Sequence, residues 1–222
     1  MSDKTVLLAL SGGLDSAVLL AYLLHEGYSP ECVGFYYGSK HNAIENEAAK
    51  KIAAHYSVNL TMIDISGVMA HFKSDLLLSG GAIPEGHYND ETMSRTVVPA
   101  RNMIFYSILV GLAESRRINH LALGVHQGDH HIYPDCRPDF INAMKYAGVL
   151  ATEGKVKGIA PFSHWNKADI VRVGLELNVP FELTRTCYKT DEVACGKCGS
   201  CTERLEAFAL NNAIDPIQYQ KK

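Results

Sequence analysis

Short apolar runs alternate with longer segments of helical spacing along most of the chain. Four runs carry few charges, as expected for strands buried on both faces of a parallel sheet, and they cover residues 5–10, 31–37, 59–65 and 120–125. Apolar spacing and boundary residues predict helices over 16–26, from 42, and over 103–114, 140–150 and 167–177. The alternation predicts an α/β fold, a doubly wound, mostly parallel sheet with helices on both faces.

Local signals mark three of the helix starts. Asn42 with Glu45, and Asn166 with Asp169, each have the spacing of a capping box. Pro138 suits the first turn of a helix, because proline lacks the N–H that this position leaves unbonded.

Two segments show no such pattern. Residues 79–96 are rich in glycine, proline and polar side chains, and they predict a mobile loop over the site, because loops of this length are otherwise uncommon in compact domains. The C-terminal residues 218–222 are expected to fray.

The first apolar run stops at a glycine-rich turn, residues 11–16. Gly12 and Gly13 permit a sharp turn and a close approach of backbone amides to a ligand. A helix that begins there points N–H groups at the turn, where an anion binds readily. No lysine follows the glycines to hold a transferable γ-phosphate, so the turn suits pyrophosphate better.

This hexapeptide, Ser-Gly-Gly-Leu-Asp-Ser, resembles the PP-loop of the ATP pyrophosphatase family, whose members adenylate a substrate oxygen and release pyrophosphate. The alternative is an ordinary strand-to-helix turn. Serines on both sides and an aspartate at the helix start favour the phosphate loop. The expected ATP-binding residues of the loop are Leu10, Ser11, Gly12, Gly13, Leu14, Asp15 and Ser16.

Length and charge limit the remaining possibilities. The 222 residues, 47% of them hydrophobic, suffice for one domain with an ample core. A formal net charge of -3 does not indicate an extended nucleic-acid surface. The sequence has neither a signal peptide nor a long uncharged apolar run. We therefore expect one domain over residues 1–222, located in the cytoplasm, without a membrane or nucleic-acid partner.

Four cysteines near the C-terminus have the spacing of a metal site. Cys187, Cys195, Cys198 and Cys201 are separated by seven, two and two residues, and glycines permit the turns between them. Four thiolates can close a tetrahedron around structural zinc, which predicts a zinc segment at about 181–210. Disulfides are disfavoured in the cytosol. An iron–sulfur cluster remains the main alternative, because four cysteines do not separate the two metals.

Beyond the loop, the chain resembles the 7-cyano-7-deazaguanine synthase family over essentially its whole length. The matching segments are Tyr37-Gly38 with His41, Pro99-Ala100-Arg101-Asn102, Tyr133 to Pro138, Pro161-Phe162, Lys167, Asp169 to Val171, Val179 to Thr184, Cys187-Tyr188, Cys195 to Cys201, Arg204 and Ala207-Phe208.

The resemblance implies an ATP-dependent carbon–nitrogen ligase that acts in queuosine biosynthesis. In that family ATP adenylates the carboxylate of 7-carboxy-7-deazaguanine, ammonia displaces AMP to form an amide, and a second ATP drives dehydration to the nitrile. The implied cofactors are ATP with Mg²⁺ and Zn²⁺ in the cysteine site, and the implied assembly is a homodimer.

The candidate site residues fall into two groups besides the cysteines. Asp15, Ser11 and Lys167 are the expected catalytic residues, with the family match placing Lys167 near the ATP phosphates. Arg101 is a candidate ATP contact, although a surface or salt-bridge role is as consistent with its sequence. The candidate substrate-binding residues, from the segment after the fourth predicted strand, are Asp129, Tyr133, Asp135 and Arg137.

The chain departs from the family pattern at several points. His130, His131 and Ile132 replace Tyr-Ser-Gly, and Arg185 stands where tryptophan is usual. Asn166 and Ser39-Lys40 also differ from the family pattern. We expect the departures at 130–132 and 185 to tune the choice of acceptor, with a cation near the substrate carboxylate or the adenylate.

Two further readings concern individual residues. His126, His130 and His131 lie close enough in sequence for a second metal site, but hydrogen-bonding or solvated histidines are commoner. Cys136 has no sequence-evident base, so packing or base contact is preferred over a role as nucleophile.

Three classes of function remain at this point. The first is the nitrile-forming ligase, or a variant that stops at the amide or takes another deazaguanine acid. The second is a PP-loop tRNA thiolase with an iron–sulfur cluster, which the net charge does not favour. A nucleotide-binding module without catalysis is the third.

Overall fold

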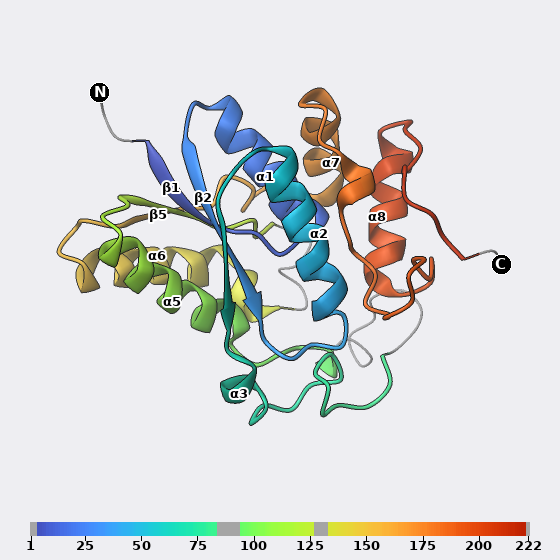
Figure 1. Ribbon diagram of the computed structural model, residues 1–222, viewed down its shortest axis with the longest axis horizontal. Helices are drawn as coiled ribbons and strands as arrows, with labels where there is room; N and C mark the ends of the chain where they lie inside the picture. Colours follow the sequence, from blue (N-terminus) through green and yellow to red (C-terminus); the bar gives the residue numbers. More distant parts are fainter. Residues whose placement is uncertain (1–3, 84–93, 127–132, 221–222) are drawn as a thin grey trace.

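The computed structural model describes residues 4–83, 94–126 and 133–220. Its centre is a parallel sheet with the strand order β3-β2-β1-β4-β5, flanked by helices on both sides (Figure 1). The strands are β1 Thr5–Ala9, β2 Ser29–Tyr36, β3 Leu60–Asp64, β4 His120–Ala122 and β5 Lys157–Ile159. The order reverses between β1 and β4, because β2 and β3 lie on one side of β1 and the later strands on the other. Ligands of such folds bind at the carboxyl ends of the strands near this reversal.

The helices follow the strands in chain order. They are α1 Leu14–His25, α2 Asn42–His55, α3 Ser66–Met69, α5 Arg101–Ser115, α6 Pro138–Ala151, α7 Lys167–Glu176 and α8 Gly199–Leu210, with 3-10 turns η2 Pro134–Cys136 and η3 Phe181–Leu183. Among the residues described, no helix is long and apolar enough to cross a membrane.

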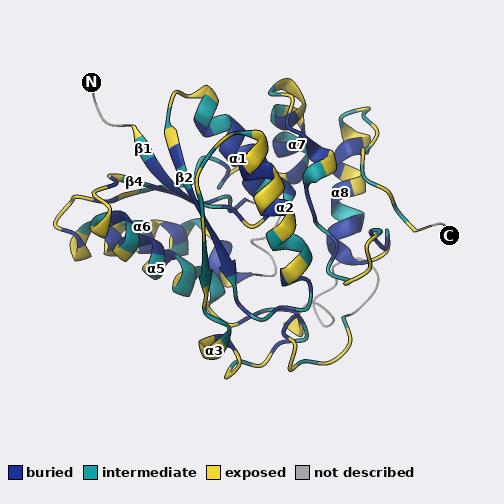
Figure 2. Cartoon of the chain, in the orientation of Figure 1, coloured by how far each residue is buried: buried dark blue, intermediate teal, exposed yellow. Residues whose placement is uncertain are grey.

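Alternate residues of the central strand face two separate hydrophobic cores. Val6 and Leu8 pack with α1, α2, α7 and α8, whereas Leu7 faces α5 and α6. Figure 2 shows the buried residues concentrated in the strands and in the helix faces that cover them. The two-sided burial explains why the strands are apolar at nearly every position. It confirms the predicted doubly wound α/β fold.

Most predicted elements are present, with small differences in their ends. The capping box at α7 is confirmed, because Asn166 Oδ1 accepts from the Asp169 amide at 2.9 Å and Asp169 accepts from the Asn166 amide. The box predicted at α2 is wrong. Asn42 is the first residue of the helix, and its side chain instead accepts from the Tyr37 amide at 2.7 Å.

β5 and α8 are among the elements that were not predicted from the sequence. β5 has only three residues, Lys157–Ile159, and a lysine and a glycine among them leave no apolar run to detect. α8 begins directly at the cysteines. Arg204 anchors α8: this fully buried guanidinium contacts Asp215 at 2.7 and 2.9 Å and Thr184 at 2.6 Å.

Residues 79–96 and 218–222, which were expected to be mobile or frayed, make hydrogen bonds and ion pairs at positions that the structure describes. The predicted lid lies partly outside the described residues, but Asp75 binds both of its ends, through the Gly81 amide at 2.8 Å and the Arg95 side chain at 2.8 Å. The tail does not fray as expected at Gln218–Gln220. There the Ala194 amide donates to the Gln218 carbonyl at 3.3 Å, and the Gln220 amide donates to the Ala194 carbonyl at 2.9 Å.

Candidate active site and metal centre

The phosphate loop joins the C-terminal end of β1 to α1. Gly12 has φ +86°, and a Cβ there would lie 2.1 Å from the Glu45 carbonyl oxygen, so the position requires glycine. The Gly13 amide donates to Ser11 Oγ at 3.2 Å, and Ser16 Oγ donates to the Gly13 carbonyl at 3.1 Å. Gly13 is the N-cap and offers no side chain to the first-turn amides. These amides are the donors an anion would use.

A charged cluster lies next to this loop. Lys167 Nζ donates to both carboxylate oxygens of Asp15, at 2.9 and 2.7 Å. Burial opposes ionisation of Asp15, but Lys167 and then His126, whose Nε2 lies 3.8 Å from Asp15 Oδ2, lower the pKa of Asp15. Glu203 Oε2 is 3.5 Å from the same ammonium group. Asp15 is therefore held as a carboxylate within reach of loop-bound phosphates.

A cavity of about 240 Å³ opens beside the loop at the reversal of strand order. Its phosphate-loop wall comes from β1, α1, α7 and α8, and its other walls from the segments after β2, β4 and η3 and from α2 and α5. The residues that line the first wall include Ser11, Gly13, Asp15, Ser16, Lys167 and Glu203. Those that line the other walls include Tyr37, His41, Glu45, Arg101, Phe105, Tyr133, Cys136, Arg185, Thr186 and Tyr188.

Arg101 brings a guanidinium into this cavity from the first position of α5. The preceding residue, Ala100, has φ +50°, a left-handed conformation that costs energy in a residue other than glycine. Arg101 Nη1 donates to the Tyr37 hydroxyl at 3.4 Å, and the guanidinium lies 5.8 Å from the centre of that ring. Within the described part of the chain no carboxylate pairs with Arg101, so an anionic ligand can.

Glu45 and His41 form a buried pair on the first turn of α2. Glu45 Oε2 lies 3.4 Å from His41 Nε2, and the two side chains are 16% and 2% exposed. Burial raises the pKa of Glu45 to about 8, against the opposing effect of Arg101 and Arg185. Burial also lowers the pKa of His41 to about 3. The pKa of Glu45 thus lies close to neutral pH, whereas His41 is uncharged there.

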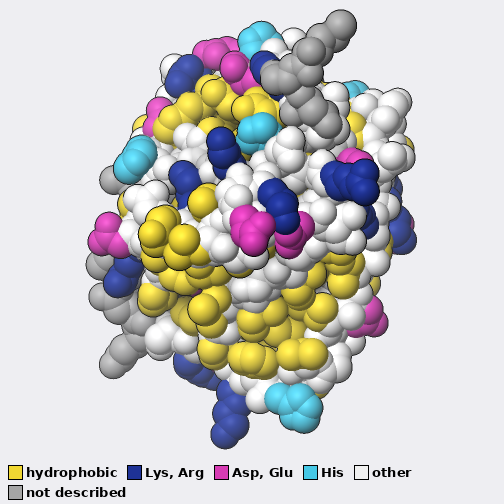
Figure 3. Space-filling model, turned by 90° about the vertical axis from the view of Figure 1, so that its left-hand side faces the viewer, with side chains coloured by type: hydrophobic (Ala, Val, Ile, Leu, Met, Phe, Trp, Pro, Cys, Tyr) yellow, Lys and Arg dark blue, Asp and Glu magenta, His cyan; other side chains and the backbone are white. Residues whose placement is uncertain are grey.

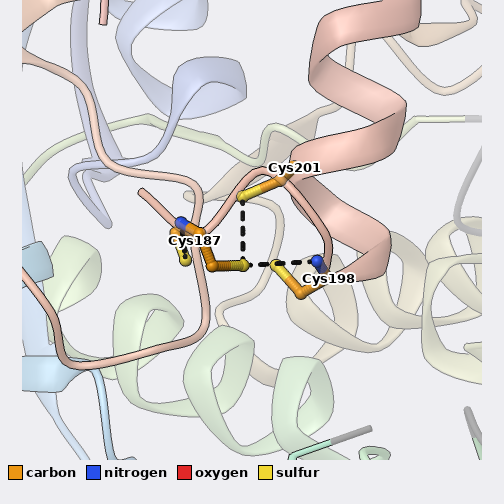
Figure 4. Close-up of side chains that lie close together, drawn as sticks. Cys187, Cys198 and Cys201 are labelled. Atoms are coloured by element: carbon orange, nitrogen blue, oxygen red, sulfur yellow. Dashed lines mark hydrogen bonds between the residues drawn. The ribbon is translucent and has the colours of Figure 1, made fainter. Parts of the chain in front are cut away.

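The four cysteines come together as predicted. Their sulfur atoms lie within 4.8 Å of one another and all four residues are buried, and Figure 4 shows Cys187, Cys198 and Cys201 turned toward one another. Cys195 Sγ and Cys201 Sγ are 4.0 Å apart. Thiolates about 2.3 Å from a tetrahedral zinc ion are separated by roughly 3.8 Å, so this cluster fits a four-coordinate metal.

Backbone amides support the thiolate form of these ligands. The Lys189 and Cys195 amides donate to Cys187 Sγ at 3.4 and 3.3 Å, and the Lys197 and Cys198 amides donate to Cys195 Sγ at 3.4 and 3.3 Å. Such bonds fix the orientation of metal ligands and favour their charged state.

Arg185 connects the cysteine segment to the phosphate loop. Its amide donates to the Gly12 carbonyl at 2.9 Å. Its guanidinium donates to the carbonyls of Lys189, Asp191 and Glu192, at 2.7, 2.7 and 3.1 Å, between the first two cysteines. We expected this side chain near the substrate carboxylate or the adenylate. It does line the cavity, but both of its Nη atoms donate to backbone carbonyls between Cys187 and Cys195, in the segment called the cysteine loop below.

The structure separates the candidate substrate-binding residues. Tyr133 lines the cavity, whereas Asp129, together with the departures at 130–132, lies outside the described residues. Asp135 does not line the cavity, because its Oδ2 accepts from the Asn102 amide at 2.9 Å and so holds the start of α5. Arg137 is exposed at the N-cap of α6. Neither Asp135 nor Arg137 is among the residues that line the cavity, and their contact with substrate stays a prediction.

Cys136 is one of the residues that line the cavity. Its sulfur lies in the cavity wall and receives a contact from Asn102 Nδ2 at 3.1 Å. This position agrees with packing or base contact.

Two cavity carboxylates were missed as site residues. Glu45 was assigned to a helix cap, and Glu203 was not considered. Glu45 precedes the buried residues Ala48, Ala49 and Ile52 by three, four and seven positions, so it lies on the buried stripe of α2. A carboxylate on an apolar stripe is the signal that could have identified it. Glu203 has no comparable signal, because α8 was not predicted.

Comparison with known proteins agrees with this geometry. The family model described as "Queuosine biosynthesis protein QueC" matches residues 5–212. The chain belongs to the QueC family. The 7-cyano-7-deazaguanine synthase of Pseudoalteromonas atlantica is 44% identical over 217 residues, 98% of this chain and 99% of the relative. The enzyme of the same name from Caldicellulosiruptor bescii is 45% identical over 95% of both chains.

Solved structures outside the QueC family share the fold. The NMN synthetase of Francisella tularensis aligns with a TM-score of 0.54 and 12% identity, over 96% of this chain and 79% of its own. The U34-tRNA thiolase NcsA of Methanococcus maripaludis, with its [4Fe-4S] cluster, aligns with a TM-score of 0.53 and 18% identity, over 96% and 66%. At these identities the similarity concerns the fold alone.

Proposed function

We propose that this QueC family member is an ATP-dependent ligase that converts 7-carboxy-7-deazaguanine and ammonia to 7-cyano-7-deazaguanine. The observation that carries the proposal is a single cavity that contains both a pyrophosphate-type loop and the guanidinium of Arg101. ATP and a carboxylate substrate each require such an anion site. Relatives that are 44% and 45% identical over nearly their full length are named 7-cyano-7-deazaguanine synthase.

Adenylation is the first step that this arrangement supports. A carboxylate is a poor electrophile until its oxygen becomes part of a phosphate leaving group. The substrate oxygen attacks the α-phosphorus of ATP, and pyrophosphate leaves onto the amides and hydroxyls of residues 10–16. Lys167 neutralises charge on the phosphates, and Arg101 holds an anionic oxygen of the substrate or nucleotide. Ammonia then displaces AMP to form the amide, and a second activation leads to the nitrile.

The two metals have separate roles in this proposal. Magnesium, when bound with ATP, offsets phosphate charge, and Asp15 is the carboxylate beside the loop that would hold it. Zinc fits Cys187, Cys195, Cys198 and Cys201, where four ligands leave no open position for substrate. The segment around 181–210 is therefore structural, and it supports the cavity through Arg185.

Mass spectrometry of the product tests the proposed reaction. The purified protein is incubated with ATP, magnesium, ammonium and 7-carboxy-7-deazaguanine, and Ser11→Ala serves as the inactive comparison. We expect the nitrile, with the amide as an intermediate. An amide that accumulates without nitrile would identify a variant that stops halfway, and unchanged acid would contradict the ligase assignment.

We also expect a cytoplasmic homodimer. Hydrophobic side chains gather on the face shown in Figure 3, on the side of α5 and α6. On these helices, Met103 of α5 is 47% exposed, and Tyr146 and Leu150 of α6 are 65% and 62% exposed. Covering this face would remove apolar surface from water. Light scattering should give twice the chain mass for the wild type and the monomer mass for Tyr146→Lys/Leu150→Glu, and an unchanged mass would place the interface elsewhere.

A further inference from the structure

Glu45 is a cavity carboxylate to which adenylation assigns no role. The first turn of α2 lies against the phosphate loop, since a Cβ at Gly12 would meet the Glu45 carbonyl oxygen at 2.1 Å. The Glu45 side chain lines the same cavity as Ser11 and Asp15. The backbone of Glu45 therefore packs against the phosphate loop, and its side chain lies in the cavity that this loop borders.

The other carboxylates that the structure describes in the cavity wall have a cationic partner. Asp15 and Glu203 share the ammonium of Lys167, at 2.7 and 3.5 Å. Glu45 has no lysine or arginine within 4 Å among the described residues, and its close partner is the neutral His41, at 3.4 Å. Among the described carboxylates of the wall, Glu45 is therefore the one without a lysine or arginine partner.

The groups that face Glu45 come from several elements. His41 lies on its own helix, Arg101 on α5, Arg185 after η3, and Tyr37 after β2. The two guanidinium groups lower the pKa of Glu45, but burial outweighs them and raises it to about 8. The carboxyl group therefore both holds and releases a proton close to neutral pH.

We propose that Glu45 is the base that takes a proton from ammonium and so releases ammonia beside the acyl adenylate. The inference rests on the proposed function. In this step the N–H bond of ammonium breaks and the proton bonds to Glu45 Oε. The nitrogen lone pair then forms the C–N bond, and the bond between the acyl carbon and the phosphate oxygen breaks. AMP leaves with those electrons, and its phosphate oxygen takes the second proton that the nitrogen loses.

The buried position suits this step. An ammonium group has a pKa of about 10, and an unperturbed glutamate of about 4.3, so proton transfer between them is strongly unfavourable. The transfer becomes more favourable as the pKa of the base approaches that of ammonium, and a base active near neutral pH is the most effective catalyst. His41 Nε2 lies 3.4 Å from Glu45 Oε2, where an N–H of the neutral imidazole would stabilise that oxygen when it is unprotonated.

Comparing two nucleophiles tests the assignment. Ammonium must lose a proton before it attacks, whereas hydroxylamine is largely unprotonated at neutral pH and attacks acyl adenylates directly. Glu45→Gln keeps the size and the hydrogen-bonding capacity of the side chain but cannot take the proton. The exposed Glu47→Gln on the same helix is the matched control. Substrate-dependent exchange of pyrophosphate into ATP reports adenylation separately.

We expect ammonium-dependent amide formation by Glu45→Gln to fall about 10²–10³-fold, with hydroxamate formation and exchange within about tenfold of wild type. Equal losses with both nucleophiles, loss of exchange, or amide formation at the wild-type rate would each overturn the role of Glu45. Thermal midpoints confirm that the variants are folded. Lack of exchange in the wild type would instead overturn the proposed function, and the step with it.

Discussion

At the scale of single residues, the site depends on charges that burial and neighbours hold in defined states. Lys167 contacts both oxygens of Asp15, and the first-turn amides of α1 lack a capping side chain. A buried ion pair is weak evidence for stability, because desolvation offsets much of the attraction. Its position beside a phosphate loop gives it a functional explanation.

The first prediction concerns these loop residues. Asp15→Asn and Ser11→Ala should each lower pyrophosphate release about 10²–10³-fold, because each removes a positioned charge or donor from the phosphate site. Circular dichroism should show an intact fold. Asp139→Asn is the matched control, because Asp139 occupies the same position in the first turn of α6 and is exposed. Turnover by the Asp15 and Ser11 variants at the level of this control would exclude the loop from the mechanism.

The second prediction follows from the raised pKa of Glu45. In the unfolded chain this group loses its proton near pH 4.5, whereas in the folded protein it does so near 8. The folded state binds more protons in this window, so stability decreases as the pH rises through it. His41 gives the opposite slope below about 6.5, the pKa of an unperturbed histidine, which leaves pH 6.5–8 for the measurement.

Urea denaturation over this window checks the prediction. The free energy of unfolding of the wild type should fall by about 2 kcal/mol relative to Glu45→Gln between pH 6.5 and 8. Parallel pH profiles for the two proteins would show that Glu45 titrates normally.

The chemical role of a residue could be predicted from the sequence where the residue belongs to a short motif. The loop and the four cysteines were found because the spacing itself encodes the geometry. The contact of Asp135 with the Asn102 amide could not be predicted, because it joins segments that sequence spacing does not relate.

At the scale of elements, α8 and the loop before it connect the metal centre to the cavity. The cysteines lie on this loop and on the first turn of α8, and Arg185 joins the loop to Gly12. Metal that orders this loop thereby also supports one wall of the ATP site. Helix α7 was predicted well because its capping box is a local signal, whereas β5 and α8 depend on tertiary packing that leaves little local signal.

The third prediction is that Cys198→Ser loses the metal and lowers the thermal midpoint. A closed four-thiolate site contributes its binding free energy to folding, of order 10 kcal/mol for small zinc domains. Elemental analysis and calorimetry measure both effects, and Cys32→Ser, a buried cysteine outside the cluster, is the control. A soluble Cys198→Ser protein with full metal content and an unchanged midpoint would contradict the structural role.

The fourth prediction concerns the three carbonyl contacts of Arg185. Arg185→Lys replaces the planar guanidinium with a compact ammonium group, so fewer of these hydrogen bonds can form at once. We expect Arg185→Lys to release its metal to a chelator several-fold faster than the wild type does. The exposed pair of Arg172 with Glu176 supplies the control variant Arg172→Lys. Equal release rates would mean that Arg185 does not stabilise the cysteine loop.

At the scale of the whole molecule, the order β3-β2-β1-β4-β5 explains why the site lies where it does. Strands β1 and β4 are neighbours in the sheet although 110 residues separate Ala9 from His120, and their carboxyl ends form the floor of the cavity. The alternation of strands and helices predicted the layers. The strand order could not be read from the sequence, because it depends on which apolar edges pair.

The central claim is that this cavity activates a carboxylate by adenylation. Transfer of oxygen-18 from the labelled carboxylate of 7-carboxy-7-deazaguanine tests it most directly, with AMP and inorganic phosphate analysed by mass spectrometry in the presence of ammonium. If the carboxylate attacks the α-phosphorus, one labelled oxygen appears in AMP with each amide formed. Label in inorganic phosphate with ADP as the product, or product formation with unlabelled AMP, would contradict the account.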